Sequence, residues 1–176
     1  MYHTLLIMIL SSTSLLIDFG SNKSGDNWYV TNDGVMGGLS KGNAVLSENS
    51  ILFSGDVSLK NNGGFTKIDS PYGTFDLSGY SSVTIRAKGE GHVAAFQLDR
   101  HQRFYLPSLK VMLEPTGEWK DYTFDLSDFK ETQMGKWTGN TMNKEELSSI
   151  IRMGFIMSNK TDGAFKWEID YINFDH

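Results

Sequence analysis

Apolar and polar residues alternate in short runs along most of this chain. In SSVTIRAKG (81–89), every second residue from Val83 to Ala87 is apolar, and the residues between them are polar or charged. A period of two indicates strands with one buried face. The same alternation in GAFKWEIDYINF (163–174) places four large side chains on one face: Phe165, Trp167, Ile169 and Tyr171.

Further apolar runs also fit strands, and turn residues separate them. IIRMGFIMS (150–158) is apolar almost throughout, which is typical of a strand that is covered on both sides. Three turns that contain glycine lie between consecutive runs: GEG (89–91), EPTGE (114–118) and DG (162–163). Each turn is expected to close an antiparallel hairpin.

One segment has the pattern of a helix start. NKEELSSII (143–151) offers Asn143 as an N-cap and Glu146 three residues later, which together form a capping box. This short helix is expected to plug one end of the fold. About ten strands with long loops predict an all-β protein, a two-sheet β-sandwich of the jelly-roll type.

The composition fits one such domain. The chain has 176 residues, including 18 glycines and 3 prolines, and 12% of its residues are aromatic, a mixture that is typical of β-domains. Acidic residues outnumber basic ones by 21 to 16 and no basic stripe is present, so nucleic acid is not expected as a partner. The absence of cysteine excludes disulfides and thiolate metal sites.

The chain begins with an apolar run, LLIMIL (5–10), which small polar residues follow, SSTS (11–14). This order resembles a signal peptide, and the run is too short to span a membrane. Residues 1–14 are therefore predicted to be a signal peptide or hydrophobic segment that exports the chain to the periplasm or out of the cell. In the alternative, they begin the first strand of a cytoplasmic protein. Residues 15–176 are predicted to form the single domain.

Catalytic chemistry has little support in the sequence. The four histidines (His3, His92, His101 and His176) are scattered, and neither a nucleophile elbow nor an HExxH motif occurs. With 21 acidic residues, some carboxylate pair is always available, so such a pair does not indicate glycoside hydrolysis. The sequence therefore predicts that the chain is not an enzyme.

Two kinds of small ligand remain open. Because the first and last strands of a sandwich often lie together, Asp18 and Asp170 are candidate ligands for Ca²⁺, and the alternative is that they cap strand ends or pair with lysine. Tyr105 and Trp137 are candidate stacking platforms for a glycan, because Trp137 lies in the loop-like QMGKWTGNT (133–141). The alternative is that these rings belong to the core.

Two glycine-rich stretches are the remaining candidates, NDGVMGGLSKG (32–42) and NNGGF (61–65). The first lacks the spacing of a phosphate-binding loop, and no helix follows it, so nucleotide binding is not expected. Both stretches either close turns between strands or form a recognition loop on the rim of the sandwich.

The same residues carry a resemblance to a known family. WYVTNDGVMGGLSKG (28–42) resembles the signature of the complex I intermediate-associated family, whose founding members help to assemble respiratory NADH:ubiquinone oxidoreductase. Similar blocks follow at 52–68, 75–91, 118–129 and 150–174. The resemblance implies a galactose-binding-like jelly roll, the fold of many carbohydrate-binding modules, with no enzymatic activity and no required cofactor. The apolar start without arginine is more like the short bacterial members than the mitochondrial ones.

The resemblance also implies a binding surface, in which the two glycine-rich stretches lie close together and dock a protein partner, as in an assembly factor or chaperone. Asp33 and Asn62 are expected to offer hydrogen bonds to that partner. The alternative is an exported module that binds a glycan. The residues of the implied surface are Asn32, Asp33, Gly34, Met36, Gly37, Gly38, Ser40, Asn62, Gly63, Gly64 and Phe65.

Overall fold

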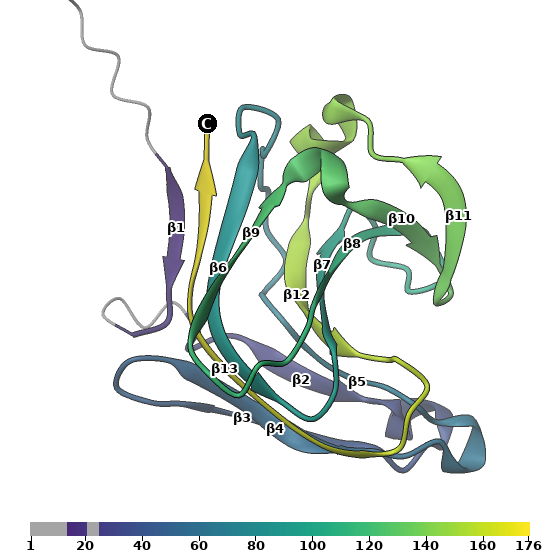
Figure 1. Ribbon diagram of the computed structural model, residues 1–176. Helices are drawn as coiled ribbons and strands as arrows, with labels where there is room; N and C mark the ends of the chain where they lie inside the picture. Colours follow the sequence, from purple (N-terminus) through teal and green to yellow (C-terminus); the bar gives the residue numbers. More distant parts are fainter. Residues whose placement is uncertain (1–13, 21–24) are drawn as a thin grey trace, which may run out of the picture.

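The computed structural model describes residues 14–20 and 25–176, so of the predicted signal segment it describes only Ser14. Within these residues the chain forms thirteen strands in two sheets that face each other, with four short 3₁₀-helical turns (Figure 1). The predicted all-β sandwich is therefore confirmed.

The two sheets are antiparallel throughout and together use strands from every part of the described chain. The first sheet has the order β3 (Lys41–Leu46), β4 (Ile51–Val57), β13 (Gly163–Asp175), β6 (Ser82–Glu90) and β9 (Lys120–Asp125), and β1 (Leu15–Asp18) also pairs with β13. The second sheet has the order β11 (Lys136–Thr141), β10 (Lys130–Gln133), β8 (Ser108–Leu113), β7 (Ala94–Asp99), β12 (Arg152–Met157), β5 (Thr66–Asp69) and β2 (Tyr29–Asn32).

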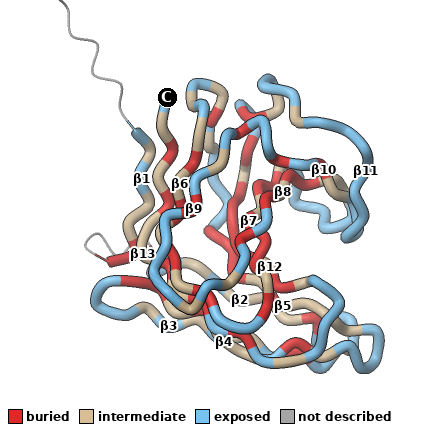
Figure 2. Tube along the Cα trace, in the orientation of Figure 1, coloured by how far each residue is buried: buried red, intermediate tan, exposed pale blue. Residues whose placement is uncertain are grey.

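The hydrophobic core lies between the two sheets, where the inward residues of both meet. Figure 2 shows buried stretches along strands of both sheets, among them β7, β8 and β12 of the seven-stranded sheet. The largest fully buried rings include those of Trp167, Phe53, Phe96, Phe155 and Phe174. Each such side chain stabilises the fold by about 1.5–3 kcal/mol. The single polar atom of Trp167, Nε1, donates a hydrogen bond to the carbonyl oxygen of His92 at 2.8 Å.

The three predicted hairpins are wrong, because each of the three turns carries the chain from one sheet to the other. GEG joins β6 to β7, EPTGE joins β8 to β9, and DG joins β12 to β13, and the two strands of each pair lie in different sheets. Alternation shows which face of a strand is buried. In a sandwich both sheets bury their inner faces, so the pattern does not reveal which strand is the partner.

The alternation of β13 is interrupted by a bulge. Its register against β6 shifts between Ile169 and Tyr171, so Asp170 is an inserted residue that exchanges the two faces of the strand. Beyond it, Ile172 and Phe174 are buried, and the predicted placement of Tyr171 beside Ile169 is wrong. At the same point β13 changes its neighbour from β4 to β1.

The predicted helix start is confirmed. Lys144–Ser149 forms a 3₁₀-helix with a complete capping box, in which the side chains of Asn143 and Glu146 each accept a backbone N–H. Leu147 is buried, and its carbonyl oxygen accepts a hydrogen bond from the Leu77 N–H at 2.9 Å, so the helix covers one end of the sandwich. Among the described residues, no helix has the length and apolar character that a membrane crossing requires.

Candidate functional site

The outer face of the seven-stranded sheet contains a cleft with a volume of about 350 Å³. Its floor consists of side chains from β5, β12, β7, β8 and β10. These side chains point away from the hydrophobic core, because they alternate along each strand with the residues that face the core. Loops border it, and both glycine-rich stretches contribute residues to the border. The polar residues of the floor include Lys67, Gln97, Asp99, Ser108, Lys110 and Arg152.

The buried carboxylate of Asp33 holds the two glycine-rich stretches together. Asp33 is 1% exposed. Its Oδ1 accepts the Ser40 N–H at 2.9 Å, and its Oδ2 accepts the Ser40 hydroxyl at 2.5 Å, the Gly64 N–H at 2.6 Å and the Phe65 N–H at 3.2 Å. Burial by itself would raise the pKa of Asp33, but these hydrogen bonds together lower it below its usual value.

Several glycines leave the space that this arrangement needs. A Cβ atom on Gly38 would lie 2.3 Å from Cγ of Asp33, and a Cβ atom on Gly63 would lie 2.6 Å from its Oδ2. Gly37 has a φ of 87°, in the left-handed region that favours glycine. Around Gly34, in contrast, a Cβ atom would meet no atom within 4 Å. The glycines at 37, 38 and 63 therefore serve the packing of the loops around Asp33.

The structure divides the implied partner-binding surface into an inner and an outer part. Asp33 and Ser40 are buried, and Asn32 uses its side-chain oxygen to accept the Gly42 N–H at 2.8 Å and the Thr66 hydroxyl at 2.6 Å. The expectation that Asp33 offers a hydrogen bond to a partner is therefore wrong, because its oxygens are occupied within the loops. The outer members line the cleft: Met36, Asn62, Gly63, Gly64 and Phe65.

Apolar side chains project into solvent around the cleft. Met36 is 62% exposed on the first glycine-rich stretch, Phe104 is 69% exposed on the loop between β7 and β8, and Met134 is 60% exposed on the turn between β10 and β11. In that turn, Met134 and Gly135 both have positive φ angles, of 50° and 72°. This is the geometry of a two-residue hairpin turn.

Arg152 is the main polar residue that sequence reasoning missed. It is 6% exposed, and its Nε donates a hydrogen bond to Oδ2 of Asp99 at 2.9 Å. Its Nη1 donates to the hydroxyl oxygens of Tyr29 at 3.0 Å and Tyr72 at 3.1 Å, and lies 3.4 Å from Oδ2 of Asp69. Burial disfavours the charged guanidinium, but Asp69 and Asp99 outweigh this effect and raise the pKa of Arg152. The sequence contained one signal for Arg152, because it is the one charged residue in the otherwise mostly apolar run 150–158.

Two lysines of the floor differ in their surroundings. Nζ of Lys67 lies 2.7 Å from Oδ2 of Asp69, a carboxyl whose pKa is raised by its burial in spite of Lys67 and Arg152. Lys110, on β8, forms no ion pair within the described residues. Burial lowers the pKa of Lys110, Asp99 opposes that shift, and the positive charge of Lys67 adds to it.

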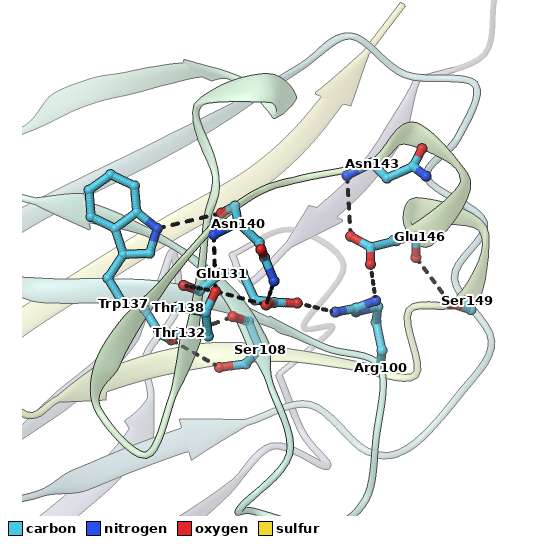
Figure 3. A network of polar contacts seen from close by, with 10 residues as sticks. All are labelled: Arg100, Ser108, Glu131, Thr132, Trp137, Thr138, Asn140, Asn143, Glu146 and Ser149. Carbon is cyan, nitrogen blue, oxygen red and sulfur yellow. Dashed lines mark hydrogen bonds and ion pairs between the residues drawn. The ribbon is translucent and has the colours of Figure 1, made fainter.

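A second polar network fixes the β10–β11 hairpin beside the cleft (Figure 3). Glu131 is buried and accepts hydrogen bonds from the Thr138 hydroxyl at 2.8 Å, from Asn140 Nδ2 at 2.9 Å and from Arg100 Nη2 at 2.9 Å. Arg100 also pairs with Glu146 of the 3₁₀-helix at 2.5 Å. Hydrogen bonds from Asn140 and Thr138 and the charge of Arg100 lower the pKa of Glu131 against the effect of its burial.

The two candidate glycan platforms lie outside the cleft lining. Trp137 is on β11, and Nζ of Lys130 lies 4.7 Å from the centre of the Trp137 ring. Nε1 of Trp137 donates weakly to the carbonyl oxygen of Asn140 at 3.5 Å (Figure 3). The hydroxyl oxygen of Tyr105 accepts a hydrogen bond from Arg103 Nη1 at 3.0 Å. Both rings are largely exposed rather than part of the core.

Asp18 and Asp170 come close together because β1 runs along β13. The Phe19 N–H donates to the carbonyl oxygen of Asp170 at 2.9 Å, and Nε of Arg86 lies 3.4 Å from Oδ2 of Asp170. Burial and the charge of Asp18 raise the pKa of Asp170, and Arg86 opposes them. Residues 14–20 and 25–176 contain no group of three or more His, Asp or Glu side chains that could hold a metal ion. Calcium at Asp18 and Asp170 stays a prediction.

The fold is similar to that of carbohydrate-binding modules. The family 11 carbohydrate-binding module of cellulosomal cellulase Lic26A-Cel5E of Clostridium thermocellum has a TM-score of 0.67 at 15% identity, over 94% of this chain and 96% of the module. A family 11 module from Clostridium thermocellum in complex with a β-1,3-1,4-mixed-linked tetrasaccharide has a TM-score of 0.62 at 15% identity, over 92% and 95% of the two chains. Similarity at this identity shows a shared fold alone.

The sequence itself matches a family model across most of its length. Residues 17–169 match Complex I intermediate-associated protein 30. The mitochondrial complex I intermediate-associated protein 30 of Mus musculus is 24% identical over 187 residues, which cover 94% of this chain and 57% of the mouse protein. This chain therefore spans less than two thirds of the length of that relative. It belongs to the complex I intermediate-associated protein 30 family.

Proposed function

We propose that this chain is a non-enzymatic docking domain, which holds a segment of a protein partner in the cleft. The observation that carries this proposal is the apolar border, where Met36, Phe104 and Met134 project into solvent from three separate loops around one cleft. Exposed apolar patches with polar surroundings are typical of interaction sites. A mouse relative that is named for its association with complex I intermediates adds support for a protein partner.

The border of the cleft favours a protein segment over a glycan. Four apolar residues of the lining are flexible and not planar: Met36, Leu59, Leu106 and Met134. Sugar rings stack on flat aromatic faces, and the lining has two phenylalanine rings, those of Phe65 and Phe104. The support for a glycan is the family 11 module in complex with a tetrasaccharide, a protein with 15% identity to this chain. Glycan binding is therefore the alternative outcome of the experiment below.

The polar groups of the cleft support binding rather than catalysis. Asp99 is the one carboxylate among the lining residues, and two nitrogen atoms of Arg152 occupy it. His101 also lines the cleft, and no hydrogen bond joins it to a nucleophilic side chain among the described residues. A base that is hydrogen-bonded to a nucleophile is the arrangement that most hydrolytic mechanisms need.

Photo-crosslinking in intact cells tests the proposal. A photoreactive residue is placed at Met36 or Met134 on the border of the cleft. The control position is Val45, which is 52% exposed on β3 of the other sheet. We expect discrete protein adducts from the first two positions and none from Val45. Adducts in the periplasmic or extracellular fraction would place the partner where the predicted signal peptide would deliver the chain.

Two outcomes would contradict the proposal. Adducts of equal yield at Val45 would show that the border of the cleft has no special role. A glycan array on which the purified chain binds, and binds no longer after Trp137→Ala or Tyr105→Ala, would favour the glycan alternative.

A further inference from the structure

The ionisable side chains that line the cleft are mostly cationic, although the chain as a whole carries a net charge of −5. Five lysine and arginine residues line it, against the single carboxylate of Asp99: Lys67, Arg103, Lys110, Arg152 and Lys160. Such a concentration of one sign at a cleft, within a chain of the opposite net charge, attracts ligands of the opposite sign to the cleft.

The positive charge is not neutralised within the cleft. Arg152 and Lys67 are paired with Asp99 and Asp69, whereas Lys110, Arg103 and Lys160 form no ion pair with any carboxylate of the described residues. Arg103 donates only to the neutral hydroxyl of Tyr105 at 3.0 Å. Three cations of the cleft are therefore available to an incoming anion.

Lys110 lies on the floor of the cleft, where burial disfavours its positive charge. It lies on β8 opposite Gln97 of β7. Burial lowers the pKa of Lys110, Asp99 opposes that shift, and Lys67 adds to it. Charges that the fold itself disfavours cluster in the clefts of functional sites. An anion above Lys110 would offset the effects of its burial and of Lys67 by direct attraction.

We infer that the partner segment is acidic, an extended peptide whose aspartate or glutamate side chains lie over Lys110, Arg103 and Lys160. This inference rests on the proposed docking function. The order β5, β12, β7, β8 and β10 gives four strand spacings. At about 4.8 Å each they span roughly 19 Å, the length of about six extended residues. Apolar residues of the segment would contact Met36 at one border and Phe104 or Met134 at another.

Fluorescence anisotropy with the full chain and labelled peptides tests the inference. The probe is a decapeptide in which glutamate and leucine alternate, and the comparison peptides have lysine or glutamine in place of each glutamate. We expect the glutamate peptide to bind at least tenfold more tightly than either comparison peptide, and its affinity to fall as sodium chloride is raised. Equal affinity for the glutamate and glutamine peptides would overturn the inference.

Matched variants locate the effect. Lys110→Met is expected to weaken binding of the glutamate peptide about tenfold while leaving the melting temperature unchanged or higher, because the variant also removes a disfavoured charge. Lys41→Gln on β3 makes the same change of net charge on the other sheet and should leave the affinity unchanged. An equal loss in Lys41→Gln would show nonspecific attraction and overturn the inference.

Two further results separate this inference from the proposed function. Crosslinks at Met36 to a partner, together with no preference for the glutamate peptide, would retain the docking function and overturn the acidic partner. Binding of polygalacturonate that Lys110→Met abolishes, with no protein crosslink, would overturn both in favour of an acidic glycan.

Discussion

At the scale of single residues, the carboxylate of Asp33 explains why so many glycines gather in two separate stretches. Four hydrogen bonds converge on this one side chain from Ser40, Gly64 and Phe65. Backbone N–H groups reach a carboxylate at such distances only where no Cβ atom intervenes, and Gly38 and Gly63 provide that space. The loops on the border of the cleft are therefore ordered from within, by a residue that no ligand can reach.

Gly38 and Gly34 make a matched pair of tests for this role. Gly38→Ala would place a Cβ atom 2.3 Å from Cγ of Asp33, whereas Gly34→Ala would meet no atom within 4 Å. We expect Gly38→Ala to lower the free energy of unfolding by about 1–3 kcal/mol, and Gly34→Ala to change it by less than about 1 kcal/mol. Urea denaturation of both variants measures the difference. Equal stability of the two variants would show that Asp33 does not order the loops.

Sequence reasoning found these glycines but assigned the wrong role to Asp33 and overlooked Arg152. Both errors have one physical cause, because burial of a polar side chain depends on partners that lie far away in the sequence. Asp33 finds them at positions 64 and 65, and Arg152 finds them at Asp99, Tyr29 and Tyr72. The pattern of residues around Asp33 or Arg152 in the sequence does not indicate these distant partners.

At the scale of secondary-structure elements, the β10–β11 hairpin depends on Glu131 for its position. This buried carboxylate joins Thr138 and Asn140 of the hairpin to Arg100, and Arg100 continues to Glu146 of the 3₁₀-helix (Figure 3). All residues of β11 are exposed, and β11 is an edge strand of its sheet. The network therefore sets where Met134 stands on the border of the cleft.

Glu131→Gln should loosen this hairpin without unfolding the sandwich. The neutral amide loses the charge-assisted bond to Arg100, which is worth about 1.5–3 kcal/mol. We expect hydrogen exchange in residues 130–141 to become at least about tenfold faster, while β6 and β13 in the core keep their protection. Exchange measured by mass spectrometry compares the variant with Glu145→Gln, which changes an exposed glutamate of the 3₁₀-helix. A uniform increase over all strands would mean that Glu131 supports the whole fold instead.

Elements that carry local signals were predictable, and their partners were not. The capping box at Asn143 and Glu146 lies within four consecutive residues, so it could be predicted from the sequence. The faces of β6 also followed from its alternation. The three turns were misread because glycine turns of this kind can either close a hairpin or cross to the opposite sheet. The inserted residue Asp170 looks like any other polar residue of its strand.

At the scale of the whole molecule, β1 joins the first described residues of the chain to its last strand. It pairs with the last residues of β13, from Leu15 opposite Phe174 to Asp18 opposite Tyr171, and Phe19 directly after it is fully buried. Figure 1 shows β1 lying beside the C-terminal strand, at the edge of its sheet. β1 therefore pairs with the part of β13 that does not pair with β4.

Truncation at two points tests the predicted boundary between residues 14 and 15. A chain that begins at Leu15 keeps β1 and Phe19, so we expect its melting temperature to equal that of the full chain. A chain that begins at Ser21 loses both, and the loss of a buried phenylalanine alone costs about 3–5 kcal/mol. At about 2–4 °C for each kcal/mol, its melting temperature should fall by roughly 10 °C. Calorimetry measures all three chains. An equal fall for the chain that begins at Leu15 would show that residues 1–14 contribute to the stability of the domain and would argue against their removal as a signal peptide.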